Sequence, residues 1–396
     1  MTKLNYDFKT VIDRYGTFST QWDFVKDRFG KEGLLPFTIS DMDFKVPQGV
    51  SDTLISAAQK GLFGYTRWNN ADFKNAIKKW FRNRYNAEIN EDFIVYSPSV
   101  IYSMAKLINQ YSERGEKVIT FSPCYDAFIN TIYGNGRKLV QFNIENGIDF
   151  NELEKVFKEE SPSVFLLCNP HNPNGIVWSE DYIKKFIELC NNYHVAIISD
   201  EIHMDIVRQG IQANTIAKFF KDITGSCAVI TSASKSFNIP GLGCSYALIK
   251  EEKDRIDFLY NLKKKDALSS VPYLGMLATI ECYNNQAEWL DQLRTYIDGN
   301  FEYLQKFLKD KLNIDYKIPE ATYLGWIDIS NSGIEMDELQ YEMVEHQNVA
   351  IMDGKVYGNG GANHLRFNLG ASEIKIQDGL DRLYKAFAVV QSNNEV

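Results

Sequence analysis

Four short apolar runs in the sequence each end in polar residues whose side chains or amides can do chemistry. The runs cover residues 93–96, 164–168, 195–199 and 229–231. In an open parallel sheet, ligands bind beyond the carboxyl ends of the strands, so the residues after these runs are candidates for a single site. They are, in chain order, Ser99, Val100 and Ile101; Asn172; Asp200 and His203; and Ser232, Ser234 and Lys235.

These residue types suit one kind of ligand. Backbone amides freed at the start of a helix, as after Ser99, can hold a phosphate group. A carboxylate such as Asp200 can hold a protonated ring nitrogen, and a lysine amine such as Lys235 can form an imine with an aldehyde. A phosphate, a ring nitrogen and an aldehyde together predict pyridoxal phosphate as the cofactor.

The middle of the chain, from about residue 90 to residue 250, predicts the elements that would position these residues. Continuous β-branched runs alternate with helical patterns, which suits strands buried on both faces by helices. One helix is marked by Ser179, a typical N-cap, followed by Tyr182, Phe186 and Leu189 at helical spacing. We therefore predict a mainly parallel α/β sheet that includes residues 93–96, 117–121, 164–168, 195–199, 229–232 and 245–249.

The two ends of the chain follow another pattern. A long amphipathic helix begins near Trp289 and carries Leu293, Ile297 and Phe301 on one face. Short strands are predicted around residues 323–329 and 364–369. We expect a smaller α+β domain here, to which the N-terminal arm could return. The predicted division is a large domain over residues 46–287 and a small domain made of residues 1–45 and 288–396.

The composition excludes several classes of partner. The chain has 43 Lys and Arg against 52 Asp and Glu, a formal net charge of −9, which gives no positive field to gather nucleic acid or anionic lipid. No apolar run approaches the roughly 18 residues that a membrane helix needs, and residues 1–10 lack the apolar core of a secretion signal. The six scattered cysteines predict buried, reduced thiols and no metal site. We expect a cytoplasmic protein.

Several motifs, in order and spacing, resemble those of the fold type I, aspartate-aminotransferase-like family of pyridoxal-phosphate enzymes. Within it, the chain is most similar to the cystathionine β-lyase or C-S lyase branch, of the MalY/PatB type. The resemblance covers nearly the whole chain and implies a seven-stranded, mainly parallel sheet in the large domain. The segments that carry it are Asn169-Pro170-His171-Asn172-Pro173-Asn174-Gly175, Asp200-Glu201-Ile202-His203, Ser40-Asp41-Met42-Asp43-Phe44 and Ser232-Ala233-Ser234-Lys235-Ser236-Phe237-Asn238.

The resemblance implies a role for each residue around the cofactor ring. Lys235 would hold the cofactor covalently and then act as the base at the substrate α-carbon, which requires a depressed pKa. Asp200 would keep the pyridine nitrogen protonated, and Asn172 would donate to the ring oxygen. Tyr125, after Ser122-Pro123-Cys124, would stack on the ring, and His203 would be a second polar neighbour.

The resemblance also implies the residues that hold the phosphate and the substrate. The phosphate would be bound by the amides of Val100 and Ile101, by the hydroxyls of Ser232 and Ser234, and by Tyr65 from a partner subunit. Ser99 departs from the family, which often has glycine there, and its hydroxyl could add a donor. Arg366, in His364-Leu365-Arg366-Phe367-Asn368, would grip the substrate α-carboxylate together with Asn172.

The function that the resemblance implies is α,β-elimination on a sulfur-containing L-amino acid such as cystathionine, to give a thiol, pyruvate and ammonia. The resemblance also implies an enzyme of amino-acid metabolism that forms a homodimer, in which the two chains share their active sites. Two alternatives stay open at this stage. A class I/II aminotransferase needs the same residues, and a pyridoxal-phosphate protein that regulates a transcription factor would keep the cofactor for a different purpose. The preferred sulfur amino acid is also left open.

Overall fold

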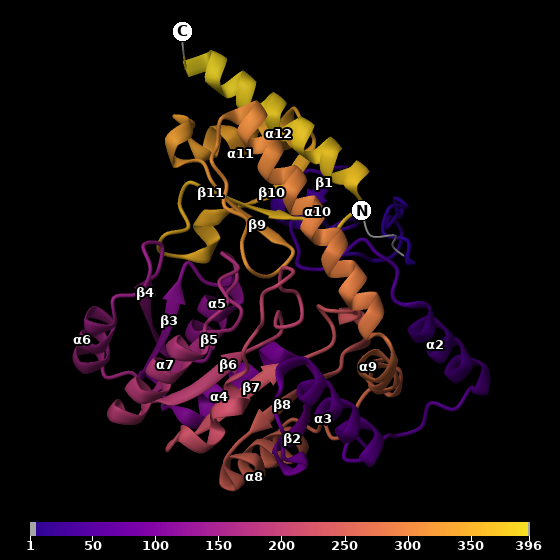
Figure 1. The fold of residues 1–396 in the computed structure, drawn as a ribbon, viewed down its shortest axis with the longest axis vertical. Coiled ribbons are helices and arrows are strands. Elements are labelled where there is room, and N and C mark those ends of the chain that lie inside the picture. Colours follow the sequence, from indigo (N-terminus) through magenta and orange to yellow (C-terminus); the bar gives the residue numbers. More distant parts are fainter. Residues whose placement is uncertain (1–4, 395–396) are drawn as a thin grey trace.

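Seven strands form the larger of two sheets in the computed structural model, which describes residues 5–394 (Figure 1). Residues 1–4 and 395–396 of the expected small domain lie outside the described part of the chain. The strand order is β2-β8-β7-β6-β5-β3-β4. Every neighbouring pair is parallel except those of β8, which runs antiparallel to both β2 and β7. The strands are β2 (Ile94–Ser97), β3 (Lys117–Ser122), β4 (Lys138–Asn143), β5 (Val164–Cys168), β6 (Ala196–Asp200), β7 (Cys227–Thr231) and β8 (Ser245–Ile249).

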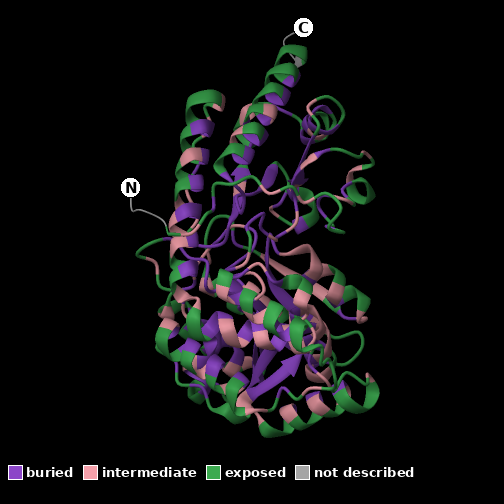
Figure 2. Ribbon diagram, turned by 90° about the vertical axis from the view of Figure 1, so that its right-hand side faces the viewer, coloured by how far each residue is buried: buried purple, intermediate pink, exposed green. Residues whose placement is uncertain are grey.

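The central strands are buried along their whole length, as their apolar sequences predict (Figure 2). The helices between them are α4 (Val100–Tyr111), α5 (Asp126–Gly134), α6 (Phe150–Glu160), α7 (Glu180–Tyr193) and α8 (Glu252–Tyr260). Ser179 caps α7 as expected, since its side chain accepts from the amide of Tyr182 at 3.3 Å. The predicted fold class, a mainly parallel α/β sheet of seven strands, is confirmed.

The smaller sheet has four strands, in the order β1-β10-β11-β9. The strands are β1 (Leu35–Phe37), β10 (Val349–Asp353), β11 (His364–Asn368) and β9 (Leu324–Asp328). The helices in the same part of the chain are α10 (Ala287–Leu312), α11 (Met336–Glu345) and α12 (Glu373–Asn394). Pro36 of β1 lies opposite Ala350 of β10, so the N-terminal arm adds a strand to the C-terminal sheet. The two predicted strands near residues 323–329 and 364–369 correspond to β9 and β11.

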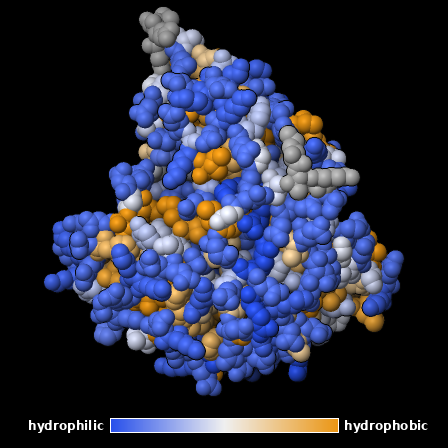
Figure 3. All heavy atoms as spheres, in the orientation of Figure 1, coloured by the Kyte–Doolittle hydropathy of each residue, from blue (hydrophilic) through white to orange (hydrophobic). Residues whose placement is uncertain are grey.

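The remaining long helices pack together beside the large sheet. They are α2 (Gln48–Lys60), α3 (Ala71–Tyr85) and α9 (Tyr273–Asn285), and both α2 and α3 pack against α9. All six cysteines are buried and none forms a disulfide. Among the described residues, no helix has the length and apolar character to cross a membrane. Apolar side chains do gather on the surface at mid-height of the view, where the parts that carry the two sheets meet (Figure 3).

Candidate active site

A cavity lies at the carboxyl edge of the large sheet, where the sequence predicts the site. The ends of β2, β3, β5, β6 and β7 all reach it, because parallel strands present their carboxyl ends on the same edge. It brings together ten of the twelve predicted site residues and leaves out Tyr65 and Arg366. The ten are Ser99, Val100, Ile101, Tyr125, Asn172, Asp200, His203, Ser232, Ser234 and Lys235.

Asp200 is the last residue of β6 and brings a buried carboxylate into the cavity. Its side chain is 3% exposed and accepts one hydrogen bond, from the amide of Ile202 at 3.1 Å. Loss of hydration raises the pKa of this carboxyl from 3.8 to about 7, against the smaller opposing effects of that amide and of Lys235. A protonated nitrogen placed beside Asp200 would supply the cationic donor that this carboxylate lacks among the described residues.

The neighbouring Glu201 is a useful contrast. It is buried too, but its carboxylate accepts from the hydroxyl of Ser199 at 2.9 Å and from the amide of Ile216 at 2.8 Å, and it does not line the cavity. Burial likewise raises the pKa of Glu201 to about 7. Glu201 therefore ties the following loop to the sheet, whereas Asp200 faces the cavity.

Lys235 follows β7 by four residues and points its amine into the cavity. The side chain is partly buried, and loss of hydration lowers the pKa of the amine from 10.5 to about 8. The positive charge of Arg366 lowers the pKa further, while the carboxylates of Asp41 and Asp200 raise it. An amine with a pKa of about 8 is partly neutral near pH 7, which is the form that can act as a nucleophile or a base.

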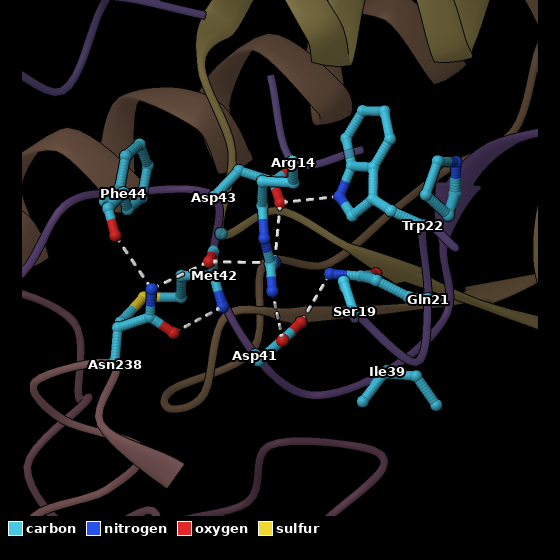
Figure 4. A network of polar contacts seen from close by, with 12 residues as sticks. Arg14, Ser19, Gln21, Trp22, Ile39, Asp41, Met42, Asp43, Phe44 and Asn238 are labelled. Atoms are coloured by element: carbon cyan, nitrogen blue, oxygen red, sulfur yellow. Dashed lines mark hydrogen bonds and ion pairs between the residues drawn. The ribbon is translucent and has the colours of Figure 1, made fainter. Parts of the chain in front are cut away.

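The amine of Lys235 donates to the backbone carbonyl of Ser40, which also accepts from the hydroxyl of Tyr323 at 2.8 Å. The chain around Ser40 is held on both sides. Figure 4 shows the guanidinium of Arg14 between the carboxylates of Asp41 and Asp43, at 2.8 and 2.9 Å. The side chain of Asn238 also bonds the backbone of this segment, at Met42 and Phe44. The motif at residues 40–44 therefore fixes an acceptor for Lys235.

The phosphate-binding feature predicted at the start of α4 has free donors. Ser99 is the N-cap, and its side-chain oxygen accepts from the amide of Tyr102 at 3.1 Å. The first amide to bond within the helix is that of Ser103, at 3.1 Å from the carbonyl of Ser99. The amides of Val100 and Ile101 have no acceptor among the described residues. They point from a helix N-terminus, where the partial positive charge favours a phosphate.

The two serines after β7 differ in what they offer. The hydroxyl of Ser232 donates to the carbonyl of Cys244 at 2.7 Å and accepts from the amide of Ser234 at 3.1 Å. Its proton is therefore already used within the protein. Ser234 lines the cavity and its side chain makes no hydrogen bond with the described residues. Ser234 is the better placed of the two to donate to a phosphate.

Tyr125 and His203 lie on the walls of the cavity. Burial raises the pKa of Tyr125, so its hydroxyl stays protonated. Burial lowers the pKa of His203 to about 3, helped by the positive charges of Lys235 and Arg366, so this imidazole is neutral. The Nδ1 atom of His203 is buried and has no hydrogen-bond partner within residues 5–394.

Arg366 reaches the site from β11 of the small sheet, but it does not line the cavity. Its guanidinium donates to the carbonyl of Thr38 at 2.7 Å and to the side-chain oxygen of Asn172 at 3.4 Å. It also lies 4.7 Å from the ring centre of Tyr357. The Nε atom is buried and has no partner in the described part of the chain. Arg366 is thus one side chain away from the cavity, joined to it through Asn172.

Tyr65 does not line the cavity of its own chain. It is fully exposed, in the segment between α2 and α3, and lines a separate surface depression. The exposed Leu62 and Phe63 precede it. Its predicted place in a partner's site is not tested by a single chain.

Several residues at the site were not predicted from the sequence. The cavity is also lined by Ser40, Cys168, Ile202, Pro240, Gly243 and Cys244. Ser40 takes part through its backbone carbonyl, a group that every residue has, so its residue type could not predict this role. The motif around Ser40 was the one available signal, and it indicated a family and not a contact.

The described residues fit pyridoxal phosphate. A buried carboxylate that makes no ion pair with the described residues, two helix-start amides without acceptors there and an amine of lowered pKa all face one cavity. These groups match the ring nitrogen, the phosphate and the aldehyde of the cofactor respectively.

Comparison with known proteins identifies relatives along nearly the whole chain. Residues 32–383 match the family model described as aminotransferase class I and II. The chain is 40% identical to protein MalY of Escherichia coli (strain K12), over 98% of this chain and all of that protein. It is 34% identical to cystathionine β-lyase PatB of Bacillus subtilis (strain 168), over 97% of this chain and all of that protein.

A solved structure agrees with these relatives. The fold superposes on cystalysin from Treponema denticola, a crystal structure described as containing a pyridoxal 5′-phosphate cofactor, with a TM-score of 0.91. The two chains are 30% identical, and the match covers 98% of this chain and all of the other. The family resemblance stated from the sequence is confirmed.

Proposed function

The chain belongs to the aminotransferase class I and II family, and from that premise we propose that it is a pyridoxal-phosphate-dependent carbon–sulfur lyase. The proposed reaction is α,β-elimination on L-cystathionine or a related sulfur amino acid. With one water it gives a thiol, pyruvate and ammonium. The observation that carries the proposal is the amine of Lys235, of lowered pKa, in a cavity with the buried carboxylate of Asp200.

Bound pyridoxal phosphate would withdraw electrons from the α-carbon of the substrate. The protein's own residues would do the rest. Lys235 would hold the cofactor through its Nζ atom until substrate arrives and then take the proton from the α-carbon. Its pKa of about 8 leaves a neutral fraction near pH 7, and the Ser40 carbonyl orients the amine. The bond from the β-carbon to sulfur then breaks, and the sulfur departs as thiolate.

Other residues would orient the reactants. Asp200 would pair with the ring nitrogen, and Tyr125 would lie against the ring. Val100 and Ile101, with Ser99 and Ser234, would hold the phosphate. Arg366, supported by Asn172, would hold the α-carboxylate through a planar, paired contact. Arg366 would have to exchange its bond to the Thr38 carbonyl for this one. His203 would stay neutral beside the ring. Ser232 would hold the turn after β7 in place through its hydrogen bonds to Cys244 and Ser234.

We also propose that the protein acts as a homodimer whose two active sites are shared. Tyr65 would enter the partner's phosphate site. The exposed Leu62 and Phe63 beside it support this proposal, because an apolar surface gains by being covered. We further propose a large domain over residues 46–287 and a small domain made of residues 1–45 and 288–396, a division supported by the two separate sheets.

The cell location and the partners are proposed on more general grounds. Six buried cysteines without a disulfide support the reducing cytoplasm. The net charge of −9 supports a protein that binds neither nucleic acid nor anionic lipid, and the amino-acid ligand follows from the proposed reaction.

The test is to incubate the purified, cofactor-loaded protein with cystathionine or cystine and to measure pyruvate and free thiol. We expect both products without any added 2-oxo acid. An aminotransferase needs the same residues but would form product only when a 2-oxo acid is supplied, and its cofactor would accumulate as pyridoxamine phosphate. That outcome would overturn the lyase proposal.

A further inference from the structure

A loose ion pair lies beside the candidate site and joins two distant parts of the chain. Arg28 belongs to the short helix α1 (Lys26–Phe29) of the N-terminal arm, and Asp126 is the first residue of α5. Their charged atoms are 3.8 Å apart, and the side chains are 48% and 23% exposed. Asp126 directly follows Tyr125, which lines the cavity. The pair is therefore next to the cavity and open to solvent.

The same pair is one side chain away from Arg366. An Nη atom of Arg28 lies 3.2 Å from the sulfur of Met352. Met352 of β10 is directly opposite Arg366 of β11, and residues opposite one another on neighbouring strands point to the same face. The ring of Tyr357 packs on the guanidinium of Arg366, and the charges of Arg28 and Asp126 both act on Tyr357 and on Tyr125. The proposed α-carboxylate site and this pair are thus adjacent.

The two ions have unused hydrogen-bonding capacity. A separation of 3.8 Å is longer than a hydrogen bond, and a thioether is a weak acceptor for Arg28. The carboxylate of Asp126 accepts no hydrogen bond from residues 5–394. The hydroxyl of Tyr357 is buried and has no partner there either. A buried polar atom without a partner is costly, which indicates that a ligand with polar atoms can complete this region.

We propose that Arg28 and Asp126 form a subsite for the far end of the substrate, where Arg28 binds a carboxylate and Asp126 binds an ammonium group. The preferred substrate is then a thioether or disulfide that links two amino-acid halves, so that its distal half is a zwitterion. This inference rests on the proposed elimination and deepens it. A ligand with one distal charge would meet an ion of its own sign as well as one of opposite sign, whereas a zwitterion can place each of its two charges beside the ion of opposite sign.

The test compares four cysteine derivatives that differ at the far end. Cystathionine carries both charges, S-(2-carboxyethyl)cysteine carries the carboxylate, S-(2-aminoethyl)cysteine carries the ammonium, and S-ethylcysteine carries neither. The variants are Arg28→Gln and Asp126→Asn, in the cofactor-loaded full chain. Lys26→Gln is the matched control, because Lys26 is an exposed cation on the same short helix that pairs with Glu32 instead.

We expect Arg28→Gln to raise the KM for cystathionine and for the carboxyethyl compound, relative to that for S-ethylcysteine, by about five- to tenfold, with kcat nearly constant. Asp126→Asn should raise the relative KM for cystathionine and for the aminoethyl compound by a similar factor. Lys26→Gln should leave all four ratios at the wild-type value. A KM that rises equally for all four substrates would mean that the pair only holds the arm in place, and KM values unchanged for all four would mean that the pair does not contact the substrate. Either result would overturn the subsite.

The subsite and the lyase proposal fail in different ways. If the wild-type protein releases pyruvate from these compounds but neither variant changes the ratios, the subsite is wrong and the lyase stands. If the wild-type protein releases no pyruvate from any of the four, the elimination itself is wrong and the subsite falls with it.

Discussion

The amine of Lys235 donates a hydrogen bond to the backbone carbonyl of Ser40, a residue 195 positions earlier in the chain. This contact joins the turn after β7 to the N-terminal arm. The arm is held in turn by Arg14, between Asp41 and Asp43, and by Lys375, whose amine lies 2.6 Å from Asp43. The position of the candidate base thus depends on the N-terminal segment at residues 40–44, which does not belong to the large sheet.

The rate of cofactor loading should depend on the protonation of Lys235. The neutral amine reacts with the aldehyde, and its fraction rises with pH until the pH exceeds the pKa of about 8. We predict that cofactor-free protein binds pyridoxal phosphate about tenfold faster per pH unit below pH 8 and at a constant rate above it. Stopped-flow absorbance measures this rate. A rate that still rises up to pH 10 would contradict the lowered pKa.

Asp41→Asn is the companion variant for this experiment. The Asp41 carboxylate raises the pKa of Lys235. Its loss should therefore lower the midpoint, which is the pH at which the loading rate reaches half of its constant high-pH value. Asp337→Asn, a change at an exposed carboxylate that pairs with Lys355, is the control and should leave the midpoint where it is.

Asp200→Asn should make the cofactor-free protein more stable and the enzyme less active. The pKa of this carboxyl is about 7 in the folded chain against 3.8 in the unfolded one, so the unfolded chain releases its proton first as the pH rises. The free energy of unfolding therefore falls between about pH 4 and pH 7, by up to about 4 kcal/mol. Asparagine does not ionise, so the variant does not lose this stability as the pH rises. Its melting temperature should exceed that of the wild-type protein at pH 8 and about equal it at pH 4.

Thermal unfolding at the two pH values measures the effect, and pyruvate release measures activity. A variant that is no more stable at pH 8 would mean that Asp200 has a cationic partner in the cofactor-free protein. A variant that keeps full activity would mean that the carboxylate does not hold the ring nitrogen.

The sequence predicted the strands of the large sheet best where a continuous apolar run ends in a polar residue. Asp200, Lys235 and Asn172 follow continuous apolar runs, and these runs are strands of the buried sheet. The edge strand β4 was missed, because its residues 138–143 are partly exposed and lack such a run. The three-residue β1 was missed because it is too short to show a period.

Two contacts at the site lie beyond sequence reasoning for physical reasons. The carbonyl of Ser40 is a backbone atom, which every residue has, so its selection by Lys235 depends on the path of the chain. The bond from Arg366 to the carbonyl of Thr38 depends in the same way on how the N-terminal arm returns over β11. The exposed position of Tyr65 shows a third kind of limit, since a residue proposed to serve a partner has no contact to predict within its own chain.

Arg366→Lys should raise KM for the amino-acid substrate much more than it changes cofactor occupancy. Lysine keeps the positive charge but cannot make the paired, planar contact with a carboxylate, so we expect a KM about 10- to 100-fold higher. Steady-state kinetics and the absorbance of bound cofactor measure the two quantities. An equal loss of both would indicate that Arg366 serves the structure through Thr38 and Asn172.

Mixing two inactive variants tests whether the sites are shared. Tyr65→Ala and Lys235→Ala chains, refolded together in equal amounts, should form mixed dimers in about half of cases. One site of each mixed dimer would combine an intact Lys235 with an intact Tyr65, so about a quarter of all sites should be wild-type in composition. Activity should rise above that of either parent. If subunits exchange and activity is only the average of the parents, Tyr65 serves its own chain or none.

The most direct test of the whole account is to find the lysine that carries the cofactor. Borohydride reduction of the yellow protein, followed by peptide mass spectrometry, should place the pyridoxyl label on Lys235. Lys235→Ala protein should take up no label and should lose at least the ~10²–10⁴-fold of activity that a positioned acid–base group supplies. A label on any other lysine, or a Lys235→Ala protein that still releases pyruvate at the wild-type rate, would contradict the assignment of the active site.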